Sequence, residues 1–273
     1  MITSVSNQRV KRIVQLNKKA GERKREGVFV AEGIKMFLEA PEEYVEEIYV
    51  SEDCPILFGK GMLLEWQEED RKRVKEKLEK RGYETVSRDV FGKMSDTQAP
   101  QGILCVVRQR SYELADMLRE GGAALLLVLE DIQDPGNLGT ILRSGEGAGV
   151  SGIVMSRDTA DIYNPKVIRA TMGSVYRMPF CYVDDLENAI GQMKKAGTEV
   201  FAAHLEGKKS YDQCDYRKAS AFLIGNEGKG LTERISLLAD VRIKIPMEGK
   251  VESLNAAVAA SLLAFEAARQ RRG

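Results

Sequence analysis

Three segments of the chain combine glycine or proline with polar side chains, and each follows an apolar run that predicts a β-strand. They span residues 130–144, 223–231 and 245–255, and they contribute a guanidinium, carboxylates, amides and hydroxyls. In open parallel sheets, ligands bind beyond the carboxyl ends of the strands. Gathered at one sheet edge, such groups could orient a polar substrate and stabilise charge that develops during a reaction.

The first segment reads Glu-Asp-Ile-Gln-Asp-Pro-Gly-Asn-Leu-Gly-Thr-Ile-Leu-Arg-Ser, and its polar candidates are Asn137 and Arg143. It is predicted to leave a buried strand, turn at Pro135-Gly136 and enter a helix near Asn137. Asparagine is a favoured N-cap residue, so Asn137 also has a purely structural interpretation. Arg143 has one as well, as a surface or ion-paired arginine, and this spacing alone is weak evidence of a site.

The second segment reads Leu-Ile-Gly-Asn-Glu-Gly-Lys-Gly-Leu and predicts a strand, a glycine turn and a helix. Glycines such as Gly225 allow a ligand to approach the backbone closely. The glycine order differs from the dinucleotide-binding fingerprint, and Lys229 lacks the following Ser or Thr of a Walker loop, which disfavours ATP or GTP. The structural alternative is a tight turn with an exposed Glu227.

The third segment reads Ile-Pro-Met-Glu-Gly-Lys-Val-Glu-Ser-Leu-Asn and leads into an apolar helix. Pro246 and Gly249 indicate a rigid loop. Ser253 or Asn255 could simply cap the helix that follows, and for this segment alone that is the favoured interpretation.

Residues 123–273 alternate apolar strands with helices, which predicts a parallel α/β sheet with right-handed crossovers. Residues 123–130 form a nearly continuous apolar run, typical of a strand that is buried on both faces. The predicted strands are 123–130, 152–155, 178–183, 200–203, 219–224 and 241–245. The predicted helices are 138–149, 165–172, 186–196, 231–238 and 254–269.

Residues 1–107 alternate strands and helices at short intervals and predict a small α/β domain, followed by a polar linker over 108–122. The predicted strands are 28–30, 45–50, 83–86 and 102–107, and the predicted helices are 7–20, 33–40 and 67–81. The whole chain has no net charge, yet residues 1–25 carry one acid, Glu22, and eight basic side chains: Arg9, Lys11, Arg12, Lys18, Lys19, Arg23, Lys24 and Arg25. Such a block suits phosphate attraction, and a solvated helix face explains it equally well.

The sequence disfavours several other classes of protein. The four cysteines are scattered singly and the only histidine is His204, so no metal site is expected. No apolar run approaches the roughly 18 residues that span a bilayer, and the N-terminus has no apolar signal core. We therefore expect a protein of the reducing cytoplasm, without a membrane or metal partner.

In this order, the three segments resemble motifs 1, 2 and 3 of the SPOUT superfamily, in its SpoU/TrmH-type branch of RNA 2′-O-ribose methyltransferases. The resemblance covers about residues 123–270, and Arg169-Ala-Thr-Met-Gly-Ser174 resembles the Ser/Gly stretch of that family. Residues 1–107 are similar to the substrate-binding domain that often precedes it. That similarity rests on Ile2-Thr-Ser-Val-Ser-Asn7, Phe29-Val-Ala-Glu-Gly33 and Gln98-Ala-Pro-Gln-Gly102-Ile.

The resemblance implies a catalytic domain with a trefoil knot near its C-terminus, a feature that general topological rules exclude. It implies S-adenosylmethionine as the cofactor, with Gly225, Ile245 and Leu254 at positions whose backbone contacts it and Met247 nearby. It also implies an RNA substrate and a homodimer with the active site at the subunit interface. The terminal helix 254–269 is then a candidate dimer helix.

The resemblance also places five side chains around the reacting atoms: Asn137, Arg143, Glu227, Ser253 and Asn255. A guanidinium resists deprotonation. We therefore expect Arg143 to stabilise negative charge on the ribose oxygen or to bind the adjacent phosphate. Glu227 would orient Arg143 or accept the proton, while Ser253 and Asn255 would fix the loop and the hydroxyl.

Three alternatives remain open at this point. A knotted fold could hold RNA without catalysis, as an assembly factor, although the complete set of polar residues argues against lost activity. A nucleotide-dependent enzyme could use the turn at 225–230. Within the methyltransferase class, ribosomal RNA is favoured over transfer RNA because a separate N-terminal recognition domain resembles the members that act on ribosomal RNA.

Overall fold

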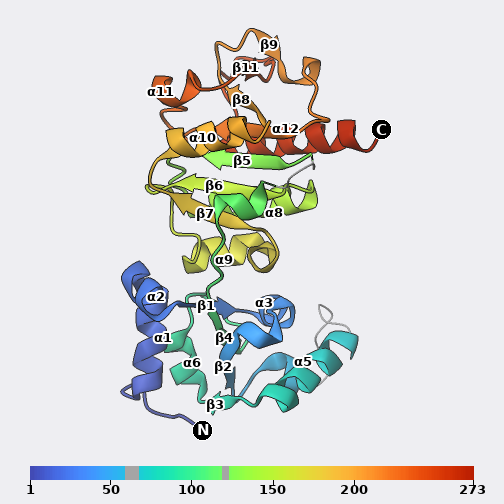
Figure 1. The fold of residues 1–273 in the computed structure, drawn as a ribbon. Helices are drawn as coiled ribbons and strands as arrows, with labels where there is room; N and C mark the ends of the chain where they lie inside the picture. The colour runs from blue at the N-terminus through green and yellow to red at the C-terminus, as the bar shows by residue number, and fades with distance from the viewer. Residues whose placement is uncertain (59–67, 119–122) are drawn as a thin grey trace. The chain divides into compact units, whose positions relative to one another are not determined.

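A computed structural model describes residues 1–58, 68–118 and 123–273 (Figure 1). The chain divides into two units, one formed by Met1–Arg110 with Tyr163–Tyr176 and the other by Ser111–Ile162 with Arg177–Gly273. Position 67 of the predicted helix 67–81 and positions 119–122 of the predicted linker lie outside the described residues.

A four-stranded sheet with the order β1-β4-β2-β3 organises the first unit. Its strands are β1 (Val28–Glu32), β2 (Val45–Ser51), β3 (Glu84–Val86) and β4 (Ile103–Arg108). Strand β4 is antiparallel to both neighbours, whereas β2 and β3 are parallel. The helices are α1 (Gln8–Lys18), α2 (Ala20–Glu26), α3 (Ile34–Glu39), α4 (Pro55–Phe58), α5 (Glu68–Arg81), α6 (Arg88–Met94) and, from the later segment, α9 (Pro165–Thr171). Two 3-10 turns, η1 (Glu42–Tyr44) and η2 (Ser174–Tyr176), complete it.

The basic N-terminal helix is amphipathic, as its spacing predicts. Val10, Ile13 and Leu16 are buried on one side of α1. The predicted helix 7–20 corresponds to α1, which ends at Lys18 because Lys19 is extended, and a second helix, α2, begins at Ala20. Only 3% of Arg23 is exposed. The expectation that the whole basic block faces solvent or phosphate is therefore wrong for this residue.

Arg23 has a structural role inside the first unit. Its Nη1 donates hydrogen bonds to the carbonyl oxygens of Leu16 at 2.6 Å and Asn17 at 3.2 Å. These carbonyls lie in the last turn of α1, where no intrahelical donor remains for them. Arg23 therefore caps a helix C-terminus instead of facing solvent.

Residues 163–176 contribute to the first unit although the sequence predicted them within domain 123–273. The Tyr163 and Phe29 rings lie 4.7 Å apart, and the Tyr176 hydroxyl donates to the Met36 carbonyl oxygen at 3.1 Å. Arg169 forms an ion pair with Asp96 at 2.9 Å. The regular alternation of strands and helices in residues 123–273 does not indicate that this segment packs in the first unit.

The second unit contains a seven-stranded sheet with the order β7-β6-β5-β10-β8-β11-β9, and every neighbouring pair is parallel. This result confirms the predicted parallel α/β architecture. The strands are β5 (Leu125–Leu129), β6 (Gly152–Ser156), β7 (Phe180–Val183), β8 (Glu199–Ala203), β9 (Lys209–Ser210), β10 (Ser220–Ile224) and β11 (Val241–Lys244). The trefoil knot stays a prediction.

The helices of this unit are α7 (Leu114–Met117), α8 (Pro135–Gly147), α10 (Leu186–Lys195), α11 (Glu233–Ser236) and α12 (Ala256–Arg271), with the 3-10 turn η3 (Tyr211–Gln213). Helices α8 and α12 pack against each other and are joined by a 2.8 Å hydrogen bond between Ser261 and Ser144. Part of the predicted linker is ordered, because Met117 of α7 is fully buried in the core of this unit. No helix in the described part of the chain is long and apolar enough to cross a membrane.

The register of the central strands aligns their carboxyl ends. Leu129 at the end of β5 pairs with Ile224 at the end of β10. On the other side of β10, Ala203 at the end of β8 pairs with Ile243 of β11. Four loops therefore leave the sheet at one edge, and three of them are the polar segments singled out in the sequence.

Candidate active site

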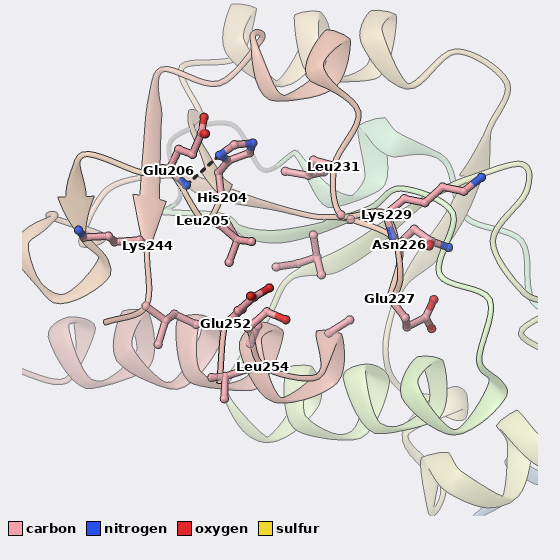
Figure 2. Close-up of a pocket in the computed structure, with 18 of the residues that line it drawn as sticks. His204, Leu205, Glu206, Asn226, Glu227, Lys229, Leu231, Lys244, Glu252 and Leu254 are labelled. Atoms are coloured by element: carbon pink, nitrogen blue, oxygen red, sulfur yellow. Dashed lines mark hydrogen bonds between the residues drawn. The ribbon is translucent and has the colours of Figure 1, made fainter. Parts of the chain in front are cut away.

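A cavity of about 820 Å³ lies at this edge of the sheet of the second unit (Figure 2). Segments 203–206, 224–231, 243–247 and 252–254 line it, together with residues of α12. Every predicted cofactor-binding residue is among them: Gly225, Ile245, Met247 and Leu254. Glu227 and Ser253 line it as well.

Glu227 connects the second segment to the first. Its carboxylate accepts hydrogen bonds from the backbone N–H of Gln133 at 3.0 Å and of Asp134 at 2.9 Å. The side-chain amide of Asn137 donates to the same carboxylate at 3.0 Å. Three donors on one carboxylate hold the loop that precedes α8 in a defined position against the 225–230 turn.

The hydrogen bonds also determine the charge state of Glu227. Partial burial raises the pKa of this carboxyl, but hydrogen bonds from Gln133, Asn137 and Asp134 lower it by more, and the net pKa lies below the ordinary 4.5. Donors that bind the charged form of an acid favour that form. Glu227 is therefore a carboxylate at neutral pH and a weak proton acceptor.

Asn137 and Asn255 join the first and third segments. The Asn255 side-chain amide donates to the Asn137 oxygen at 2.9 Å. The oxygen of Asn255 accepts from the backbone N–H of Ala257 and Val258, so Asn255 is also the N-cap of α12, as the structural interpretation predicted. The amide–amide contact adds a second role to that cap.

Asn137 is not the N-cap that its sequence position suggested. The cap of α8 is Asp134, whose carboxylate accepts from the backbone N–H of Asn137 at 2.8 Å, with Pro135 in the first turn. Proline is well suited to the first helical position because its missing N–H is not needed there. Asn137 thus lies inside the helix, which leaves its side chain available for Glu227 and Asn255.

The two arms of the turn at 225–230 are joined by backbone hydrogen bonds. Asn226 and Gly230 exchange backbone hydrogen bonds at 3.1 and 2.9 Å. A Cβ atom added at Gly225 would lie 2.1 Å from the carbonyl carbon of Gly230. The sequence assigned this glycine to close ligand approach, and the structure gives it a second requirement, the close approach of the two arms of the turn.

Two acidic residues that were not selected from the sequence, Glu130 and Asp131, bind the segment that follows β10. Asp131 is in the left-handed region with φ 55°, and its carbonyl oxygen accepts from the Asn226 side chain at 2.7 Å. Buried Glu130 accepts from the backbone N–H and the hydroxyl of Thr232 at 2.8 and 2.7 Å. The available signal was a pair of acids directly after an apolar strand, where a buried acid needs donors.

Arg143 stands apart from these contacts. It is exposed on α8, about two turns after the N-cap, and it does not line the cavity. Across the residues that the structure describes, no hydrogen bond or ion pair involves its guanidinium, and Glu227 binds the 133–137 loop in place of Arg143. The expected orientation of Arg143 by Glu227 is therefore not observed within the chain.

Sequence reasoning also missed the fourth loop of the cavity. His204, Leu205 and Glu206 follow β8, and the backbone N–H of Glu206 donates to Nδ1 of His204 at 3.2 Å (Figure 2). Glu252 of the third segment lines the cavity too, although only its neighbours Ser253 and Leu254 were selected from the sequence. The alternation of strand and loop predicted where β8 ends, but not which strand lies beside β10.

Two family models match successive parts of the chain. The model of the SpoU rRNA Methylase family matches residues 124–265. A second model, the MRM3-like substrate binding domain, matches residues 7–105. These ranges fall in the catalytic and substrate-binding regions expected from the sequence.

Individual relatives are similar over the whole length of the chain. The 23S rRNA (guanosine(2553)-2′-O)-methyltransferase RlmP of Bacillus subtilis is 31% identical, over 97% of this chain and 97% of that protein. An AdoMet-bound rRNA methyltransferase structure from Sinorhizobium meliloti has a TM-score of 0.80 and 29% identity, covering 98% of this chain and 97% of the other.

The SpoU methyltransferase AviRb from Streptomyces viridochromogenes has a TM-score of 0.81 and 25% identity, covering 97% of this chain and 98% of that one. The family models, the relatives that match nearly the whole chain and the similar solved structures all point to the same class of enzyme as the three segments at the sheet edge. The chain therefore belongs to the SpoU rRNA methylase family, which confirms the predicted class of S-adenosylmethionine-dependent RNA 2′-O-ribose methyltransferases.

Proposed function

We propose that the protein methylates the 2′-hydroxyl of a guanosine in 23S ribosomal RNA. The observation that carries the proposal is the network joining Glu227, Asn137 and Asn255 beside the cavity, since it assembles all three motifs in one place. Similarity to the Bacillus subtilis guanosine 2′-O-methyltransferase over nearly the whole chain supports the substrate. A ribosomal RNA substrate also supports the predicted cytoplasmic location.

The cavity fits the methyl donor. S-Adenosylmethionine, when bound, supplies an electrophilic methyl group on a positively charged sulfur. Gly225, Ile245, Met247 and Leu254 would hold it, because they line a cavity large enough for a drug-sized ligand and present both backbone polar groups and apolar side chains. Glu206, Glu252, Lys229 and Lys244 line the same cavity, and their side-chain charges of both signs match a ligand that carries charges of both signs.

The proposed reaction is a direct displacement at carbon. A bond forms between the ribose 2′-oxygen and the methyl carbon, the sulfur–methyl bond breaks, and its electron pair stays on sulfur. Arg143 stabilises the developing negative charge on the 2′-oxygen or holds the adjacent phosphate, and the hydroxyl proton passes to water. Glu227 is a positioning residue in this scheme, because its carboxylate is occupied by three donors and has a lowered pKa.

The test is methyl transfer from radiolabelled S-adenosylmethionine to unmodified 23S rRNA, followed by nuclease digestion and mass spectrometry of the nucleosides. We expect 2′-O-methylguanosine as the labelled product. Transfer RNA and 16S rRNA are the comparison substrates. Label on a nucleobase, or on transfer RNA alone, contradicts the proposal.

Exposed lysines of the N-terminal helices are the proposed RNA contacts of the first unit. Lys18, Lys19 and Lys24 are exposed, whereas Arg23 is buried. We expect reversal of these three lysines to glutamate to weaken RNA binding. The negative slope of log affinity against log salt should become shallower by about 2. The reason is that a phosphate contact that is lost no longer releases condensed counterions on binding.

Filter binding at several salt concentrations measures this slope. The matched control reverses Lys72, Lys75 and Lys80, three exposed lysines of α5 in the same unit, and we expect it to bind as wild type. A slope unchanged from wild type in the first variant indicates a solvated helix face.

Arg23→Ala should instead lower the free energy of unfolding by about 1–3 kcal/mol, because buried carbonyls lose their donor.

The proposed homodimer uses α12. Val258, Leu262 and Phe265 are 46%, 38% and 44% exposed, and their spacing of four and three residues puts them on one face of the helix. An exposed apolar stripe of this kind marks an interaction surface. Two copies of one helix can pack face to face across a twofold axis.

We expect Leu262→Asp combined with Phe265→Asp to convert a dimer into a monomer, because each carboxylate would be buried without a partner. Light scattering of the purified protein measures the mass in solution. Leu237→Asp, at another exposed leucine of the same unit, is the control and should leave the mass unchanged. A wild-type monomer at micromolar concentration overturns the dimer proposal.

A further inference from the structure

Four carboxylates line the cavity, and two of them are already engaged. Glu227 accepts three hydrogen bonds from the 133–137 loop. Glu233 forms an ion pair with Arg242 at 2.7 Å. Across the described chain, the carboxylates of Glu206 and Glu252 take part in no hydrogen bond or ion pair, so these two remain available to a ligand.

The two available carboxylates point in different directions. Figure 2 shows the Glu252 side chain directed toward the middle of the cavity, between Leu205 and Leu254, whereas the Glu206 carboxylate points away from Leu254. Glu252 is exposed and lines the cavity together with Leu205 and Leu254, so it presents negative charge to a ligand that fills the cavity. Glu206 is exposed as well, and its carboxylate is directed away from Leu254.

We infer that Glu252 makes the donor site charge-selective, with its carboxylate facing the sulfonium of S-adenosylmethionine and favouring it over S-adenosylhomocysteine. The inference rests on the proposed function. The two molecules share adenosine and the amino-acid group, and they differ by a methyl group and by the positive charge on sulfur. Any residue that separates them strongly must sense one of these two differences.

The surroundings of Glu252 suit a sulfonium better than the α-ammonium of the same ligand. An ammonium carries three N–H donors that each need an acceptor, and Leu205 and Leu254 have no side-chain acceptors. A sulfonium has no N–H group and tolerates apolar neighbours. Where ligand and leucines displace water, the attraction between carboxylate and sulfonium is stronger than in bulk solvent.

Charge selectivity has a consequence for turnover. Transfer of the methyl group leaves a neutral thioether, so the attraction to Glu252 disappears at the moment the product forms. The by-product then binds more weakly than the donor and leaves the cavity more readily. Glu252 acts on binding and release, and it is separate from the groups proposed to stabilise the reacting oxygen.

Isothermal titration calorimetry tests the inference without any RNA. The proteins are wild type, Glu252→Gln and the control Glu248→Gln, which lies on the same loop, is exposed and does not line the cavity. Both variants change the net charge by the same amount. The ligands are S-adenosylmethionine, S-adenosylhomocysteine and sinefungin, in which a protonated amine takes the place of the methylated sulfur.

We expect Glu252→Gln to weaken S-adenosylmethionine and sinefungin binding about tenfold and to leave S-adenosylhomocysteine binding within about twofold. Glu248→Gln should match wild type for all three. Equal weakening of all three ligands overturns the inference and assigns Glu252 to the α-ammonium. Unchanged binding overturns it as well. If wild type binds neither adenosyl compound, the donor site of the proposed function fails instead.

Discussion

Arg143→Ala is expected to lower the rate of methyl transfer at least about a hundredfold while leaving the affinity for S-adenosylmethionine unchanged. The side chain is exposed on α8, is not among the residues that line the cavity, and makes no ion pair in the described chain. Its loss therefore costs neither folding nor donor binding. It removes only a positive charge proposed to act on the ribose oxygen or its phosphate.

Single-turnover transfer to 23S rRNA measures the rate, and calorimetry measures donor binding. Arg143→Lys keeps the charge but loses the planar fork, so it should recover only part of the activity. Arg234→Ala, an exposed arginine of α11 paired with Glu187, serves as the control and should transfer at the wild-type rate. Unchanged turnover in Arg143→Ala refutes the assignment.

Glu227→Ala is expected to lower the transfer rate about a hundredfold through a loss of positioning. Without the carboxylate, the backbone N–H groups of Gln133 and Asp134 and the amide of Asn137 lose their acceptor. Asn137 then no longer holds Asn255 in one orientation. Misplacement of catalytic groups by about 1 Å can cost about this factor.

Hydrogen exchange distinguishes this role from proton transfer. We expect faster exchange of the Gln133 and Asp134 amides in Glu227→Ala, together with the rate loss. Glu248→Ala, which removes an exposed carboxylate that does not line the cavity and accepts no hydrogen bond within the described chain, is the control. Wild-type exchange with lost activity would identify Glu227 as the proton acceptor.

The lowered pKa of Glu227 also predicts how this contribution depends on pH. A carboxyl whose pKa is lower in the folded state stabilises that state at pH values above its ordinary pKa of 4.5. The stabilisation is lost as pH falls through the lowered value. The difference in unfolding free energy between wild type and Glu227→Gln should therefore be largest near neutral pH and shrink below about pH 4.5.

Several features of the site were predictable because they depend on local sequence. Apolar runs such as 123–130 identified the buried parallel strands, since hydrophobic periodicity reflects burial whatever the strand order. The three polar segments were found at strand ends, where parallel α/β proteins bind ligands. Asn255 is the helix cap and was one of the two candidates, with Ser253, because capping depends on a few neighbouring residues.

Other features depended on contacts between distant parts of the chain. A cap was the structural alternative for Asn137, but Asp134 takes that position and leaves Asn137 to bind Glu227. Arg23 was grouped with solvent-facing cations, but it reaches back to the Leu16 carbonyl. For the cap, two residues of suitable type were available, and for Arg23 one residue had two possible roles, so local spacing could not decide either case.

By itself, the sequence determined the family, the parallel sheet and the residues that can do chemistry, because these follow from residue types and short spacings. Only the tertiary structure decided which polar group binds which, that residues 163–176 pack in the first unit, and that Glu252 points into the cavity. The reason is physical. A buried donor or acceptor binds whichever partner the strand order brings within about 3 Å. Strand order cannot be predicted from short stretches of sequence, because it depends on contacts between distant parts of the chain.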